Sequence, residues 1–225
     1  MSLPGWLSAL DRDDALAEAS ACSDRVSRAQ ALRLAGGAMA TTLALGAGPA
    51  RAAQRSDVAI LNYALSLEYV QAAFYTEAER AGALHGALAH QARIVGAHER
   101  AHVAAFRKVL GRHAIARPHF DFHGRTEQPD AFRDTAVAFE DLAVAAYKDK
   151  VPLIENPTYL STAVAIHSVE ARHAAWIRRL AGVLPATHAF DEPLSQARVE
   201  RLVASTHFIV AEPRTEAHRR PRFTG

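Results

Sequence analysis

Two stretches of this sequence follow one plan, and each contains a Glu-x-x-His motif. The motifs are Glu99-Arg-Ala-His102 and Glu170-Ala-Arg-His173, and the chain has no others. A glutamate precedes each motif by about 30 residues, and a tyrosine follows that glutamate seven residues later. These pairs are Glu68 with Tyr75 and Glu140 with Tyr147. An internal repeat of this kind predicts a fold built from two equivalent halves.

Apolar residues recur with the helical period from Ser56 onward, which predicts four long helices. We expect them over about 57–81, 85–110, 130–149 and 157–181. Ser56 and Asn156 are suited to cap the first and last helices, and Pro157 suits a first helical position. No segment carries strand signals.

The connections within each half are short, so each pair of helices should form an antiparallel hairpin, whereas residues 112–128 can span the length of a bundle. The sequence therefore predicts an all-α protein. We expect a four-helix bundle of two hairpins joined by a long crossover over residues 56–182, followed by a short C-terminal extension over 183–225.

Six ionisable side chains fall on the apolar stripes of the predicted helices. Glu68 and Glu140 each lie on the first helix of a hairpin, and each Glu-x-x-His places two groups on one inward face of the second helix. Four carboxylates in an apolar layer repel one another and lose their hydration, and no lysine or arginine shares these stripes. Two divalent cations would balance the charge, with neutral imidazoles completing the coordination. The predicted metal ligands are Glu68, Glu99, His102, Glu140, Glu170 and His173. A metal-free bundle is the alternative.

This pattern resembles the exported ferritin-like domain family, which includes desiccation-related proteins. The resemblance covers residues 57 to about 195 through LNYALSLEYVQAAFY, HERAHVAAF, FEDLAVAAY, VEARHAAW and AFDEPLS. It implies that Glu99 and Glu170 bridge two ions, that Glu68 and Glu140 are terminal ligands, and that His102 and His173 bind one ion each.

Other polar residues near these motifs have two interpretations. Tyr75 and Tyr147 could hydrogen-bond a ligand or donate an electron to the metals, but we favour core packing with a satisfied hydroxyl. His167 could assist the site, but we favour a surface or interface histidine. The crossover histidines fit no strong metal motif; they are His113, His119 and His123.

Residues 1–52 have the features of an export signal. An apolar stretch over 34–48 follows arginines and precedes Ala50-Arg51-Ala52, a small-x-small cleavage pattern. The segment 27–33 resembles a twin-arginine signal, although Ala29 stands where the second arginine belongs. We therefore expect a periplasmic or extracellular protein without a stable membrane span in its mature chain; a cytoplasmic N-terminus with an incidental apolar patch is the alternative.

Composition narrows the function. A net charge of +2 gives no support for nucleic-acid binding, and the basic tail Arg214–Arg222 is expected to be solvated. The single cysteine, Cys22, excludes a disulfide framework and a rubredoxin-type iron centre within this chain.

Three functions fit these observations. The first is a pair of iron ions that reacts with oxygen or peroxide, as a ferroxidase or oxidase in stress protection. The second is a catalase-like enzyme with two manganese ions. The third is a non-enzymatic envelope or desiccation-stress protein in which the metals only stabilise the bundle. The sequence leaves open whether the chain forms a homo-oligomer.

Overall fold

The computed structural model describes residues 49–211, with side chains from Ser56 onward. Residues 49–187 and 191–211 belong to one compact unit. Cys22, the basic tail and the predicted export signal up to Gly48 lie outside the described residues, so the export signal stays a prediction.

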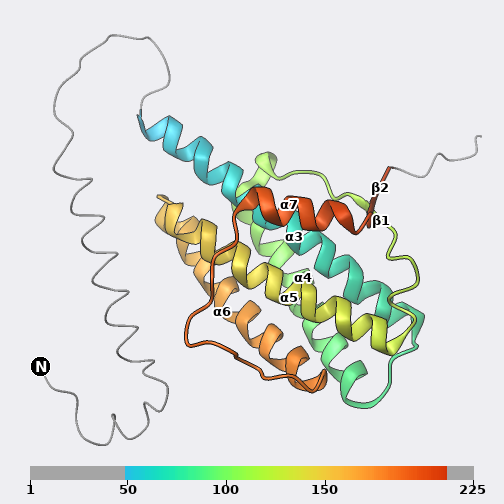
Figure 1. Ribbon diagram of the computed structural model, residues 1–225. Helices are drawn as coiled ribbons and strands as arrows, with labels where there is room; N and C mark the ends of the chain where they lie inside the picture. Colours follow the sequence, from blue (N-terminus) through green and yellow to red (C-terminus); the bar gives the residue numbers. More distant parts are fainter. Residues whose placement is uncertain (1–48, 212–225) are drawn as a thin grey trace, which may run out of the picture. The chain divides into compact units, whose positions relative to one another are not determined.

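Four long helices dominate this unit, and they pack side by side with α3 next to α4 and α5 next to α6 (Figure 1). Their bounds are Pro49–Ala81 for α3, Gly86–Leu110 for α4, Pro129–Lys150 for α5 and Pro157–Leu180 for α6. The two hairpins contact each other through α4 with α6 and α3 with α5. The predicted all-α bundle of two hairpins joined by a crossover is therefore confirmed.

The two ends of α6 follow local sequence chemistry. The side chain of Asn156 accepts hydrogen bonds from the backbone N–H groups of Thr158 and Tyr159, and Pro157 takes the first helical position. Gly182 follows α6 with a φ of 74°, a left-handed conformation that glycine adopts without a steric cost. These predicted ends of α6 hold to within one residue.

The start of the first helix differs from the prediction. α3 begins at Pro49 rather than near Ser56, so Ser56 lies inside the helix and does not cap it. Alanine, arginine and glutamine fill all of positions 50–55, and all three are strong helix formers. Their summed propensity continues the helix past a residue that would otherwise suit a cap.

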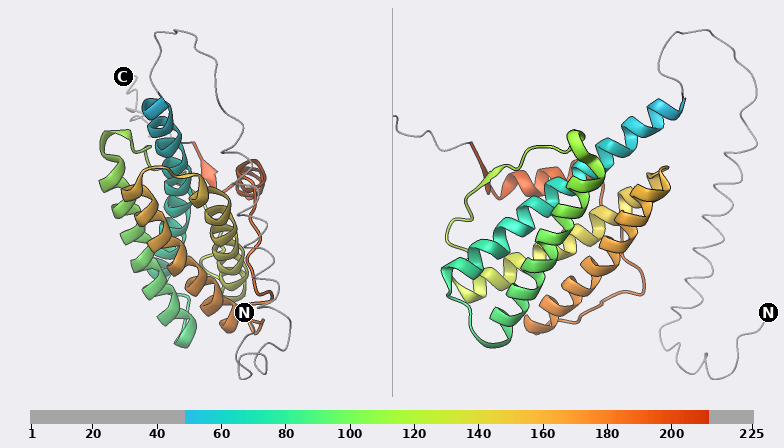
Figure 2. Two further views of the ribbon diagram at one scale, coloured as in Figure 1. Left: turned by 90° about the vertical axis from the view of Figure 1, so that its left-hand side faces the viewer. Right: turned by 180° about the vertical axis from the view of Figure 1, so that it is seen from behind.

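The C-terminal extension carries structure that the sequence analysis did not predict. Helix α7, Gln196–Ser205, packs through Val199 against Tyr63 and Leu67 of α3 and Ala146 of α5. A two-residue strand in the crossover, β1 (His119–Phe120), pairs antiparallel with β2 (Ile209–Val210). The expectation of no strands was therefore wrong. Each of these strands has only two residues, which is too few to show an alternating pattern in the sequence. The rear view of Figure 2 shows α4 and α6 nearest the viewer and α7 on the far side.

The apolar core is divided into two main clusters along the helices. The first includes Phe74 of α3, which stacks on Phe132 of α5 with ring centroids 5.0 Å apart. The second includes Leu65 of α3 and Phe106 of α4. On α4, α5 and α6 the predicted metal ligands fall between the residues of the two clusters. On α3, Glu68 lies at the end of the second cluster, beside Tyr69 and two residues before Val70 of the first. Buried apolar side chains therefore close off these ligands on both sides along the bundle. Among the described helices, none combines the length and apolar character needed to cross a membrane.

Candidate metal centre

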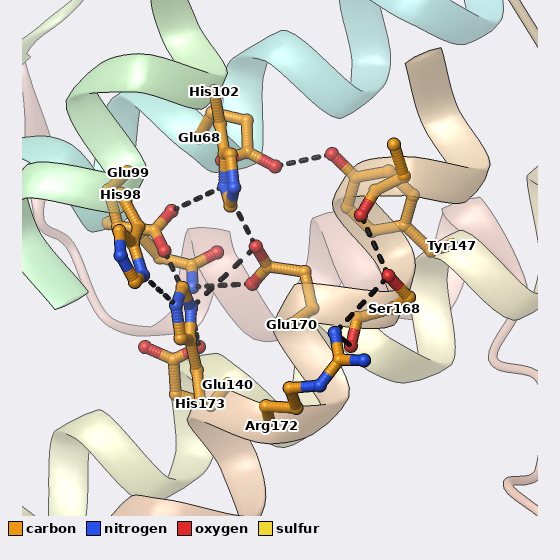
Figure 3. Close-up of polar contacts among 12 residues, drawn as sticks. Glu68, His98, Glu99, His102, Glu140, Tyr147, Ser168, Glu170, Arg172 and His173 are labelled. Carbon is orange, nitrogen blue, oxygen red and sulfur yellow. Dashed lines mark hydrogen bonds and ion pairs between the residues drawn. The ribbon is translucent and has the colours of Figure 1, made fainter. Parts of the chain in front are cut away.

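All six predicted ligands meet in the middle of the bundle. Glu68 comes from α3, Glu140 from α5, and the two Glu-x-x-His motifs from α4 and α6 (Figure 3). The four glutamates are 0% exposed, while His102 and His173 are 8% and 2% exposed. Buried, unpaired carboxylates are rare in proteins, so their concentration here needs a compensating charge.

The six side chains form two overlapping groups that are each suited to a metal ion. Within each group, one potential ligand atom per residue lies within 4.8 Å of all the others. One group contains Glu68 and His102, the other contains Glu140 and His173, and both contain Glu99 and Glu170. This sharing matches the arrangement of two bridging and two terminal carboxylates that the family resemblance implies.

Each histidine directs its Nδ1 atom at three carboxylates. Nδ1 of His102 lies 3.0 Å from Oε1 of Glu170 and 3.2 Å from Oε2 of Glu68. It lies 3.7 Å from Oε2 of Glu99. Nδ1 is therefore the atom through which this histidine would bind a metal.

The second half-site repeats this arrangement around His173. Its Nδ1 atom lies 3.0 Å from Oε1 of Glu99 and 3.6 Å from Oε2 of Glu140. The distance to Oε1 of Glu170 is 3.8 Å. The pseudo-symmetry of the sequence repeat thus appears in the positions of these imidazole and carboxylate atoms.

Several of these atoms have no hydrogen-bond partner among the described residues, although they lie within ion-pair distance of one another. They are both oxygens of Glu99, Oε2 of Glu140, Oε1 of Glu170 and Nδ1 of His173. Buried polar atoms are rarely left without partners. Their common direction and their oxygen and nitrogen chemistry fit a pair of divalent transition-metal ions.

In the absence of a metal, the cluster holds extra protons. Burial, followed by the negative charge of Glu99, raises the pKa of Glu68 from 4.5 to about 7. Burial and the charge of Glu68 raise the pKa of Glu170 to about 8. Divalent cations would compete with these protons for the same oxygens.

The histidines respond to the same charges. Burial alone would lower the pKa of His102, but the surrounding carboxylates, led by Glu170, raise it to about 12. For His173, the carboxylates of Glu140 and Glu99 likewise overcome burial and raise the pKa to about 10. Both rings are therefore imidazolium ions at neutral pH when no metal is present, and they supply part of the positive charge that the carboxylates require.

The two tyrosines of the repeat cross between the halves. The hydroxyl of Tyr75 on α3 donates to Oε1 of Glu140 at 2.5 Å. The hydroxyl of Tyr147 on α5 donates to Oε1 of Glu68 (Figure 3). Both rings are buried, as expected for core packing. Their hydroxyls, however, donate to predicted ligands of the cluster, in agreement with the alternative interpretation. Burial and the partner carboxylate raise the pKa of each tyrosine, so the hydroxyls stay protonated and keep donating.

The surroundings of these tyrosines differ between the halves. Gly96 lets α4 approach Tyr75, because a Cβ at this position would lie 2.9 Å from the Cβ of Tyr75. In the other half, His167 takes the place of this glycine in the repeat. Its ring stacks on Tyr147 at a centroid distance of 6.0 Å, and its buried Nδ1 has no hydrogen-bond partner among the described residues. His167 is thus a half-buried neighbour of the site, contrary to the favoured surface interpretation.

Two contacts of the cluster were not anticipated from the sequence. Nε2 of Gln71 donates to Oε2 of Glu170 at 3.5 Å. The exposed His98 places its Nδ1 2.9 Å from Nε2 of His173, with the two rings stacked at 5.2 Å (Figure 3). His98 lies four residues before His102 on α4, and this helical spacing could have indicated that it is near the cluster. An exposed histidine next to Glu99 in the sequence, however, more commonly indicates a solvated residue. The crossover histidines belong to neither of the two groups found among the described residues.

Comparison with known proteins supports the same architecture. A family model described as a ferritin-like domain matches residues 56–183. No curated protein matches the chain.

Proposed function

The chain belongs to the ferritin-like domain family, and on this premise we propose that the six clustered side chains bind two transition-metal ions that react with oxygen or peroxide. The ligands would be Glu68, Glu99, His102, Glu140, Glu170 and His173. Iron is the proposed metal, and the activity would be that of an oxidase or ferroxidase in stress protection.

The observation that carries this proposal is the buried charge balance. Four carboxylates lie in the core, and the only cationic groups that face them among the described residues are the two histidines. Two divalent ions bring four positive charges and would turn both histidines into neutral ligands. A purely structural cluster would be expected to carry an arginine or lysine partner in place of metals.

The metal pair, when bound, would supply redox chemistry and an acidic site for oxygen ligands. The residues around it hold and orient the ligands. Tyr75 and Tyr147 fix the terminal carboxylates by donating a hydrogen bond to each. The apolar clusters on either side exclude water, which strengthens every electrostatic interaction in the cluster.

Oxygen and peroxide consumption by metal-loaded protein tests the activity. The protein should be loaded with Fe(II) and compared with Glu99→Gln, which removes a charge shared by both half-sites. Glu127→Gln, an exposed glutamate on the crossover, is the matched control. We expect rapid Fe(II) oxidation by the wild type and by the control, and at least tenfold slower oxidation by Glu99→Gln. Equal rates for all three proteins would refute the proposed activity. Peroxide disproportionation with manganese but not iron would instead identify a catalase-like enzyme.

One observation favours a second function. The cluster draws ligands from all four helices, so bound metals would cross-link the bundle without any turnover. For this structural role we expect a large loss of melting temperature on chelation, together with no oxygen or peroxide consumption under any condition. Turnover by the wild type would exclude a purely structural role.

A further inference from the structure

The two half-sites are not equivalent outside their ligands. Nε2 of His173 lies 2.9 Å from Nδ1 of His98, and the rings stack with an interplanar angle of 16°. At the position that corresponds to His98 in the repeat, the other half has Val169. Within the described part of the chain, no side chain hydrogen-bonds Nε2 of His102, so only one of the two ligand histidines has such a support.

The proton on His173 fixes the direction of this hydrogen bond. Nδ1 of His173 faces the carboxylates, so a bound ion would occupy Nδ1 and leave the proton on Nε2. With an ion on Nδ1, the Nε2–H group of His173 donates and Nδ1 of His98 accepts.

A hydrogen bond of this kind strengthens a metal ligand. An acceptor on the outer nitrogen of an imidazole holds the ring in place, selects its tautomer and raises the basicity of the metal-binding nitrogen. Loss of such an acceptor typically weakens metal binding by about 10–100-fold. In this protein the acceptor is an exposed side chain on α4, so its removal disturbs no core packing.

We propose that His98 is a positioning residue for His173, and that through it the half-site of Glu140 and His173 binds its ion more tightly than the half-site of Glu68 and His102. This inference rests on the proposed metal site but concerns a different property, the inequality of its two positions. It predicts that the two ions load one after the other rather than together.

Stepwise Co(II) titration, followed by the visible absorption of the bound ion and by competition with a chelator, tests this proposal. His98→Phe keeps an aromatic ring that can stack on His173 but removes the acceptor, and His98→Ala removes both. His98→Asn keeps an acceptor near the position of Nδ1. His90→Phe is the matched control, because His90 is another exposed α4 histidine, whose ring lies beside Trp176 and not beside the cluster.

We expect the first ion to bind about 10–100-fold more weakly in His98→Phe and in His98→Ala, and within about threefold of wild type in His98→Asn and His90→Phe. The second ion should change by less than about threefold in all four variants. Wild-type affinity in His98→Phe and His98→Ala would overturn the proposal. Equal weakening in His98→Asn would also overturn it, because a retained acceptor would then not preserve the affinity.

Two further variants, each lacking one terminal carboxylate, assign the effect to one half-site. Glu68→Gln should leave the ion held by His173, and Glu140→Gln should leave the ion held by His102. Adding His98→Phe should weaken the remaining ion in the Glu68→Gln background only. An equal or reversed effect would overturn the assignment. If the wild type binds no Co(II), the proposed metal site itself fails; if it binds two ions and His98→Phe changes neither, only the present inference fails.

Discussion

Replacing Glu68 by glutamine should have opposite effects on the metal-free and the metal-loaded protein. Glu68 is 0% exposed, and its pKa in the folded, metal-free chain rises from 4.5 to about 7. A raised folded-state pKa adds stability that is fully present below pH 4.5 and is lost as the pH rises through 7. At pH 8.5 the ionised carboxylate therefore costs about 3 kcal/mol relative to its neutral form.

Glutamine imitates the neutral carboxyl group and can still accept the hydrogen bond from Tyr147. Its amide N–H group would face Nδ1 of His102, which now lies 3.2 Å from Oε2, and the lost hydrogen bond costs about 1 kcal/mol. We therefore expect Glu68→Gln to stabilise the metal-free protein by about 2 kcal/mol at pH 8.5. At pH 5 the two effects, each about 1 kcal/mol, nearly cancel.

Urea unfolding followed by circular dichroism measures both states. In chelator at pH 8.5, Glu68→Gln should unfold at a higher urea concentration than the wild type. With saturating metal the order should reverse, because a ligand has been lost. The exposed Glu127→Gln should change stability by less than about 0.5 kcal/mol in both states. Destabilisation of the metal-free protein at pH 8.5 would refute the argument from buried charge.

Three other outcomes follow from the structure. The substitutions Tyr75→Phe and Tyr147→Phe should each lower the free energy of unfolding, measured with urea, by about 1.5–3 kcal/mol, because each leaves a buried carboxylate oxygen without its donor. Wild-type stability of either variant would contradict this. Metal affinity, measured by competition with a chelator, should rise at least about tenfold per pH unit between pH 6 and 7. Metal binding must displace protons from His102 and His173, whose pKa values are raised. An affinity that does not change with pH would argue against ligation by these histidines. Asn156→Ala should cost about 1 kcal/mol through the lost cap of α6, and Asn156→Ser should recover most of it.

The parts of the site that the sequence predicted are those that one helix determines by itself. The spacing of Glu99 and His102 places both on one face of α4, and the repeat supplies the matching pair on α6. The short connections pair the helices, and the absence of a basic residue on the stripes indicates metal. These features depend on periodicity and charge, which a sequence displays directly.

The features that the sequence did not predict depend on how helices face each other. Tyr75 donates to Glu140 rather than to Glu68 on its own helix, and this pairing is set by the distance and rotation between α3 and α5. His98 contacts His173 because α4 and α6 are adjacent. The docking of α7 rests on one buried valine, Val199, in a ten-residue helix, too weak a pattern to predict its place on the bundle.

Elemental analysis of the purified protein tests the central claim most directly. The protein should be isolated without added chelator, loaded with Fe(II) or Mn(II), freed of excess metal by gel filtration, and measured for metal atoms per chain. Two half-sites that share Glu99 and Glu170 predict about two ions per chain in the wild type. A count near zero, or one that the substitution Glu99→Gln leaves unchanged, would contradict a two-metal centre in the core of this bundle.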